Sequence, residues 1–119
     1  MPPGFGIATV EKIAINAAMA GCRPEHMPVL ITAVQCIADP KIFLRNQVMS
    51  TAGQAPLILV NGPIAREIKL NSKCCALGPG AVSYANTAIG RALRLVMMNI
   101  GHTYPEITDM ATVGSPMKY

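Results

Sequence analysis

Apolar residues recur at intervals of three or four over two neighbouring stretches of the chain, the spacing that puts them on one face of a helix. Both stretches lie within residues 9–38, and a turn rich in Gly and Pro at 21–28 separates them. Thr9 can cap the first helix, and proline is tolerated in the first turn of the second. Asp39 and Pro40 end the pattern. We therefore expect a helical hairpin over residues 9–38.

A third periodic stretch, the longest, begins at Ser83 or Asn86, either of which can cap a helix, and ends at Gly101. Its apolar positions share one face: Ile89, Ala92, Leu93, Val96, Met97 and Ile100. Gly90 inside this helix costs about 1 kcal/mol relative to alanine, which suggests the close approach of a helix or a ligand. Residues 102–119 carry no periodic pattern, and we expect an extended tail that is either disordered or laid across a partner chain.

The segment 55–80 begins with a continuous run of large aliphatic residues at 57–60, between a proline and a glycine turn. Such a run is typical of a strand buried on both faces, which indicates α/β architecture. A second strand is expected near 46–50 and a short helix over 63–68. The predicted fold is one α/β or α+β domain over 1–119, with a helical hairpin, a small buried sheet and a long C-terminal helix. With so few strands, a complete sheet would need strands from a second chain.

The composition indicates a surface that is unusually poor in charge. Of 119 residues, 51% are hydrophobic and 13% are charged, about half the charged share of an ordinary soluble domain. Such a surface is hard to keep in solution alone, so we expect an obligate homo- or hetero-oligomer. The net charge of +4 comes from scattered Lys and Arg among few aromatics, which argues against nucleic-acid binding and suits a small anionic substrate.

No apolar stretch is long and charge-free enough to span a membrane, and the first residues lack the basic and apolar regions of a signal peptide. We therefore expect a cytoplasmic protein whose four cysteines are free thiols. Cys36 falls within an apolar helix and is expected in the core. Cys74 and Cys75 are adjacent in a loop, where they suit redox exchange or soft-metal binding, or have no role; no CxxC or His spacing supports a metal site.

Cys22 is the first candidate for chemistry, because it lies in a turn beside Arg23 and close to the start of the next helix. Positive charge and the helix dipole both favour a thiolate, and hence a nucleophile or a metal ligand. His26 in the same turn and His102 are candidate general bases. The alternative interpretation is a small buried thiol in a tight turn and two ordinary surface histidines.

Two glycine turns are candidates for the wall of a pocket: Asn61, Gly62 and Pro63, and Gly78, Pro79 and Gly80. Glycine lets backbone N–H groups approach a ligand closely, and an asparagine side chain can orient a carbonyl or a carboxylate. Arg66 and Arg91 can add a charged clamp for an anion. The alternative is that both turns are tight connections required by packing. Neither turn has the spacing of a dinucleotide-binding or P-loop motif.

Five segments of the chain carry a resemblance to a known family: VEKIAINAAMAGCRPEHMPVLITAV, APLILVNGPIAREI, ALGPG, NTAIGRALRLVMMNIG and DMATVGSPMKY. On these segments the chain resembles a bacterial family of thiol oxidoreductase-like proteins that carry a selenocysteine-Gly-Ser-Cys motif, although no Cys-Gly-Ser-Cys occurs in this chain. It implies one subunit, or one portion, of a larger enzyme whose other part supplies missing residues. The motif positions to which it implies a role are Cys22, Glu25, Asn61, Arg66 and Arg91.

These observations predict a subunit of an oligomeric cytoplasmic enzyme that acts on a small polar or anionic molecule at a site shared between chains. The chemistry would be thiol-based redox, lyase or hydrolase chemistry with Cys22, Glu25 and His26 as the catalytic candidates. No cofactor is identified. A non-catalytic structural subunit that buries its apolar faces against a catalytic partner is the alternative, and a metal carrier that uses Cys74 and Cys75 is a third hypothesis.

Overall fold

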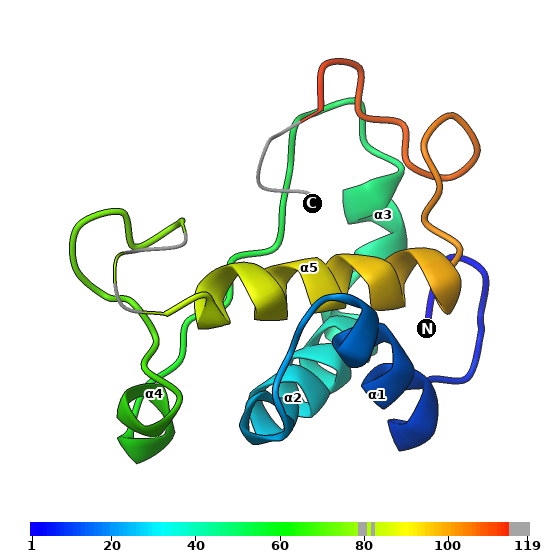
Figure 1. The fold of residues 1–119 in the computed structure, drawn as a ribbon. Coiled ribbons are helices and arrows are strands. Elements are labelled where there is room, and N and C mark those ends of the chain that lie inside the picture. The colour runs from blue at the N-terminus through cyan, green and yellow to red at the C-terminus, as the bar shows by residue number, and fades with distance from the viewer. Residues whose placement is uncertain (79–80, 82, 115–119) are drawn as a thin grey trace.

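The computed structural model describes residues 1–78, 81 and 83–114, and in this part of the chain every regular element is a helix (Figure 1). The α-helices are α1 Val10–Met19, α2 Met27–Ala38, α3 Leu44–Val48, α4 Pro63–Glu67 and α5 Ala85–Asn99, with short 3₁₀ helices at Pro24–His26 and Pro40–Ile42. No single helix among the described residues is long and apolar enough to cross a membrane. The runs Pro24–Ala38 and Pro40–Val48 pass that test only as a pair, across a 65° bend.

The predicted helical hairpin is confirmed as α1 and α2. Thr9 caps α1, because its Oγ1 accepts a hydrogen bond from the Lys12 N–H at 3.3 Å. Gly21 leads the chain out of α1 at a φ of +81°, a left-handed conformation that glycine adopts without a Cβ clash. Pro28 stands in the first turn of α2, where its missing N–H would have had no helical partner.

The predicted C-terminal helix is also confirmed, as α5, and it lies across α1 and α2 to close the core (Figure 1). The core joins apolar residues of the three helices: Ile13, Ala17, Leu30, Ala33, Val34, Ala92, Leu93, Val96 and Met97. Asn16 is buried among them, and its Oδ1 accepts a hydrogen bond from Asn99 Nδ2 at 2.6 Å. This polar contact fixes α1 against α5 at a single register.

The predicted α/β class is wrong, because the described residues contain no sheet. The expected strand near 46–50 overlaps α3, where Leu44 and Val48 lie one helical turn apart and are both buried in the core. The expected strand at 57–60 is extended, but it pairs with no other segment of the described chain. A lone strand cannot satisfy its own backbone, so a buried sheet does not form.

Residues 53–61, called the extended wall below, connect α3 to α4 without helix or turn (Figure 1). Ile58 and Val60 contact the apolar core, whereas Leu57 and Leu59 are 60% and 87% exposed. This alternation is that of a strand with one buried face, not of the strand buried on both faces that the aliphatic run predicted. One face of the extended wall therefore packs on the core, and the other face is largely exposed.

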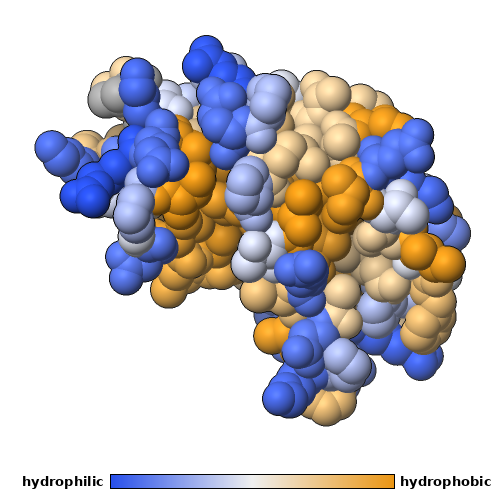
Figure 2. Space-filling view, turned by 90° about the horizontal axis from the view of Figure 1, so that it is seen from below, coloured by the Kyte–Doolittle hydropathy of each residue, from blue (hydrophilic) through white to orange (hydrophobic). Residues whose placement is uncertain are grey.

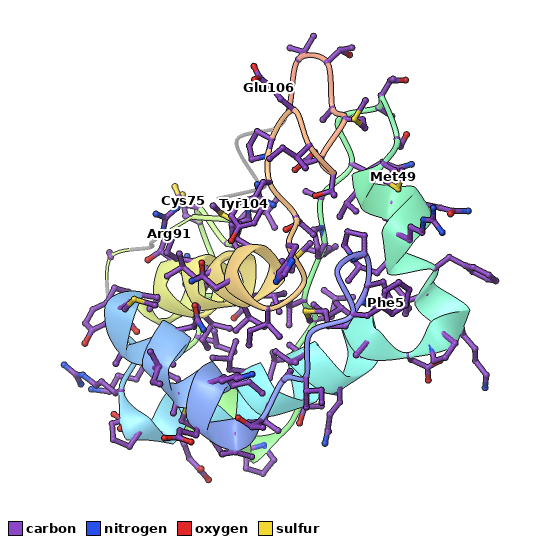
Figure 3. The ribbon with its side chains drawn as sticks, turned by 90° about the vertical axis from the view of Figure 1, so that its right-hand side faces the viewer. Phe5, Met49, Cys75, Arg91, Tyr104 and Glu106 are labelled. Carbon is purple, nitrogen blue, oxygen red and sulfur yellow. The ribbon has the colours of Figure 1, made fainter. Side chains whose placement is uncertain are left out.

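The residues after α5 fold back on their own chain. The Met110 N–H donates to the Val48 carbonyl at 3.0 Å, and Thr112 Oγ1 donates to the Thr51 carbonyl at 2.9 Å. Figure 3 shows the loop that carries Tyr104 and Glu106 beside the end of α3. Residues 115–119 lie outside the described residues, and contact of the tail with a partner chain stays a prediction.

Candidate functional site

A cavity of about 330 Å³ lies between α2, α3, the extended wall and α5. Apolar side chains from all four elements line it: Ile37, Leu44, Val48, Leu57, Ile58, Leu93 and Met97. Its polar lining consists of Cys36, Gln47, Gln54, Arg94 and Asp109. Since a water molecule takes about 30 Å³ in the liquid, the cavity has room for about ten heavy atoms. An apolar cavity with a few polar groups is typical of a small-molecule site.

Gly90 opens this cavity on the side of α5. A Cβ placed on Gly90 would have no other atom within 4 Å, so no side chain or neighbouring helix fills the space in front of it. Arg94 follows one helical turn later and also lines the cavity. Gly90 and Arg94 therefore lie on the same face of α5 and border the same cavity. The glycine predicted to permit close approach thus leaves room for a ligand, not for a helix.

Arg94 is held by two residues of the loop that follows α5. Its Nη2 lies 3.4 Å from Asp109 Oδ2, and its Nη1 donates a hydrogen bond to Thr103 Oγ1 at 3.2 Å. The Arg94 and Asp109 side chains are only 11% and 6% exposed. Taking two charges out of water costs several kcal/mol, which their attraction must offset. The remaining N–H donors of the guanidinium can bind a further anion.

A second cavity, of about 560 Å³, lies between α2, the extended wall and α4. Both cavities share Cys36, Ile37, Pro56, Leu57 and Ile58. The prediction that Cys36 belongs to the core is wrong, because its thiol is exposed at the edge of the apolar stripe of α2, where it lines both cavities. Asn61 lines the second cavity, and among the predicted site residues that the structure describes it alone lines either cavity.

The predicted catalytic residues lie elsewhere, in the turn before α2. Cys22 is half-buried and contacts both apolar clusters of the protein. Burial raises the pKa of its thiol, which is opposite to the activation expected from Arg23 and the following helix. Cys22 is therefore a protonated packing residue near neutral pH, and the geometry gives no support to a nucleophile at this position.

His26 is buried in the same turn, and its Nδ1 accepts a hydrogen bond from the Arg23 N–H at 3.3 Å. Burial is the main cause that lowers the pKa of the imidazole, while Glu25 raises it and Arg23 lowers it. The imidazole meets the ring of Tyr84 edge-on, with 6.3 Å between the centroids. A neutral histidine that accepts the N–H of its own turn holds the turn in place, which is a structural role.

Arg23 and Tyr84 join this turn to the start of α5. Arg23 Nε donates a hydrogen bond to the Tyr84 hydroxyl at 2.8 Å, and its guanidinium carbon lies 5.3 Å from the ring centroid. Glu25 is exposed, and its Oε1 lies 4.0 Å from Arg23 Nη1. The contact of Tyr84 with this turn could not be predicted from the sequence, because 61 positions separate Tyr84 from Arg23 and no local pattern connects them.

Among the described residues of the two predicted glycine turns, Asn61 lines a cavity, whereas Gly62 and Gly78 do not. Gly62 precedes α4 at a φ of +100°, and α4 is too short to build up a substantial dipole at its N-terminus. The Gly78 N–H donates to the Cys75 carbonyl at 2.8 Å and closes a turn. Gly80 lies outside the described residues. Both described glycines therefore serve the path of the chain.

Two arginines predicted to clamp an anion lie on the surface of the protein. Arg66 and Arg91 are exposed and line neither cavity, and Figure 3 shows Arg91 on the outer side of α5. Arg94 is the buried arginine of this helix. The signal that could have found it is Gly90 one turn before it, which leaves an opening on the same helical face.

The adjacent thiols of Cys74 and Cys75 lie on an exposed loop with 3.8 Å between their Sγ atoms. Asn86 holds this loop, since its Nδ2 donates to the carbonyls of Asn71 and Ala76 at 3.0 and 2.9 Å. Within the described ranges, no group of three or more His, Cys, Asp or Glu side chains is placed to bind a metal ion. The loop thus presents two thiols without a third ligand from the described residues.

No protein-family model, no curated protein and no solved structure matches this chain. The resemblance to the family with the selenocysteine-Gly-Ser-Cys motif therefore stays a prediction.

Proposed function

We propose that this chain is a subunit of an oligomeric protein that binds a small molecule with an apolar body and one anionic group. The cavity between α2, α3, the extended wall and α5 takes the apolar body, and Arg94 meets the anion. The observation that carries the proposal is the open space at Gly90 in a cavity that is also lined by Arg94, whose side chain is only 11% exposed. Burial of the apolar body supplies affinity at about 25 cal/mol per Å², and the charge-assisted hydrogen bond supplies orientation.

This proposal keeps the small anionic molecule expected from the sequence and moves its site away from the Cys22 turn. Thiol chemistry on the ligand would then use Cys36, the cysteine that lines both cavities. All four cysteines are free, which supports a reducing cytoplasm as the location.

Calorimetric titration with octanoate, a carboxylate of about the right size, tests the site. Octanoate is expected to bind at least about tenfold more tightly than 1-octanol, because only the carboxylate can pair with Arg94. Gly90→Leu fills the gap and is expected to weaken octanoate binding by about tenfold or more while the circular dichroism of the helices is retained. Unchanged binding in a folded Gly90→Leu variant would contradict the proposed site.

A pair of arginine variants tests the role of the charge. Arg94→Met combined with Asp109→Leu removes both members of the ion pair and leaves no buried charge without its partner. This variant is expected to bind octanoate and 1-octanol about equally. Arg91→Met is the matched control, because Arg91 is exposed on the same helix and should leave the preference for octanoate intact. The reverse pattern would place the anion at Arg91 and overturn the proposal.

A structural subunit is the second candidate, favoured by the apolar surface. Figure 2 shows apolar side chains gathered in patches between hydrophilic ones. The most exposed large apolar residues include Ile7, Leu59, Ile107 and Val113, at 74%, 87%, 74% and 98%. For a purely structural subunit, octanoate would not bind and Gly90→Leu would leave assembly unchanged, whereas serine at these positions would weaken assembly.

A further inference from the structure

The backbone of the extended wall has no hydrogen-bond partner within the described part of the chain. None of its N–H or C=O groups from residue 53 to 61 bonds to another backbone group there, and no described side chain takes their place. Loops elsewhere in the molecule are held by backbone hydrogen bonds, within a turn at Gly78 and between distant segments at Met110 and Val48. An extended, unpaired run of backbone is the template to which another strand adds.

The side chains of the extended wall alternate between a face that packs on the core and a face that is exposed. Ile58 and Val60 contact the core, whereas Leu57 and Leu59 are 60% and 87% exposed. No charged residue stands between Arg45 and Arg66, so neither face of this strand carries a charge that would repel a second copy of itself. Charged side chains are the usual protection of exposed strand edges, and the extended wall lacks them.

We propose that two copies of this chain pair through their extended walls as antiparallel strands, related by a two-fold axis at Ile58. Residue 57 of one copy then stands opposite residue 59 of the other, and residue 55 stands opposite residue 61. The arrangement is isologous, because the same segment is used on both sides.

Pro56 selects this register. In an antiparallel pair, alternate residues direct their N–H and C=O groups to opposite edges of the strand. Residues 55, 57, 59 and 61 share one edge and all carry an N–H, whereas Pro56 leaves the other edge with a missing donor. With Ile58 at the axis as a non-hydrogen-bonded pair, Leu57 and Leu59 exchange N–H···O bonds and Pro56 stands where no donor is needed.

The pairing goes beyond the proposed ligand and does not depend on it. Residues 54–58 line the first cavity, so a paired wall would hold one side of the cavity in place.

Analytical ultracentrifugation over micromolar to millimolar concentrations tests the pairing, with two variants at one position. Leu59→Pro removes an N–H from the paired edge, and Leu59→Ala removes most of the same side chain but keeps that N–H. Both variants should fold, since Leu59 is exposed and its backbone has no partner within the described chain. The wild type and Leu59→Ala are expected to be dimers, and Leu59→Pro a monomer whose helical circular dichroism is unchanged.

Amide exchange followed by NMR gives the register. At dimer concentrations the N–H groups of Leu57, Leu59 and Asn61 are expected to exchange at least about tenfold more slowly than on dilution, while those of Ile58 and Val60 are unaffected. A wild type that is monomeric throughout, or a dimer that survives Leu59→Pro, would overturn the proposal. So would protection that appears at Leu57 and Leu59 only when a strand of a different polypeptide is added. Octanoate binding by a monomer would leave the ligand proposal standing while this one fails.

Discussion

The helical core and the extended wall are both strongly apolar, but only the core is complete within one chain. Each helix bonds its own backbone and needs only to bury one stripe, and α1, α2 and α5 bury their stripes against one another. The extended wall buries one face and leaves its backbone unbonded to the described chain. A helix can therefore satisfy its backbone hydrogen bonds within its own segment, whereas a strand needs a second segment to bond its backbone.

The largest expected difference between the helical core and the extended wall is the stability lost when a leucine is replaced by alanine. Leu30 is fully buried in the core, and Leu59 of the extended wall is 87% exposed. Leu30→Ala is expected to lower the free energy of unfolding by about 2–5 kcal/mol. Leu59→Ala is expected to change it by less than about 0.5 kcal/mol when the protein is monomeric. Urea denaturation at low protein concentration measures both, and similar losses would show that the extended wall belongs to the core.

This contrast explains which parts of the fold could be predicted from the sequence. The hairpin and α5 were predictable, because helical periodicity, Thr9 as a cap and Gly21 as a stop are local signals. The extended conformation of 57–60 was predictable for the same reason. A sheet was not predictable from that run alone, because strand pairing is a property of two segments and the second is missing from the described chain. The composition predicted that part of the surface is covered by another chain, but it did not indicate which residues form that part.

Replacing glycine by alanine is expected to change the stability by a smaller amount, with opposite signs at Gly90 and Gly62. Gly90 of α5 and Gly62 at the end of the extended wall both have open space where a Cβ would stand. Gly90→Ala is expected to stabilise the protein by about 0.5–1 kcal/mol through helix propensity. Gly62→Ala, at a φ of +100°, is expected to destabilise it by about 1 kcal/mol through backbone strain. Thermal unfolding measures both changes in stability. If both variants were stabilised, or both destabilised, the local backbone conformation would not be the cause of the difference.

The candidate site was less predictable than the fold. Cys22 and His26 have the neighbours that activate a catalytic group, but burial acts against the charged form of each side chain and outweighs those neighbours. Burial is a tertiary property, so the sequence of the turn could not show it. Arg94 and Asp109 approach from α5 and the loop after it, and only the folded loop brings them to one cavity. Arg91 and Arg94 both lie beside the apolar stripe in sequence, so the helical pattern alone could not show that Arg94 lines the cavity.

The smallest expected effect, a pH dependence, tests whether His26 belongs to the core. Burial lowers the pKa of its imidazole below the ordinary value of 6.5, so the unfolded chain takes up a proton at a higher pH than the folded protein does. The stability from a neutral His26 is therefore complete above about pH 6.5, falls as the pH drops toward the folded pKa, and levels off below it. His26→Asn, whose side-chain oxygen can accept the Arg23 N–H, should flatten this dependence, and His102→Asn at an exposed imidazole should not. Urea denaturation between pH 5 and 8 measures the three proteins, and a wild type that gains stability on acidification would mean that His26 is charged in the fold. In that case the turn before α2 would hold an imidazolium beside Glu25, and the catalytic hypothesis for this turn would regain its physical basis.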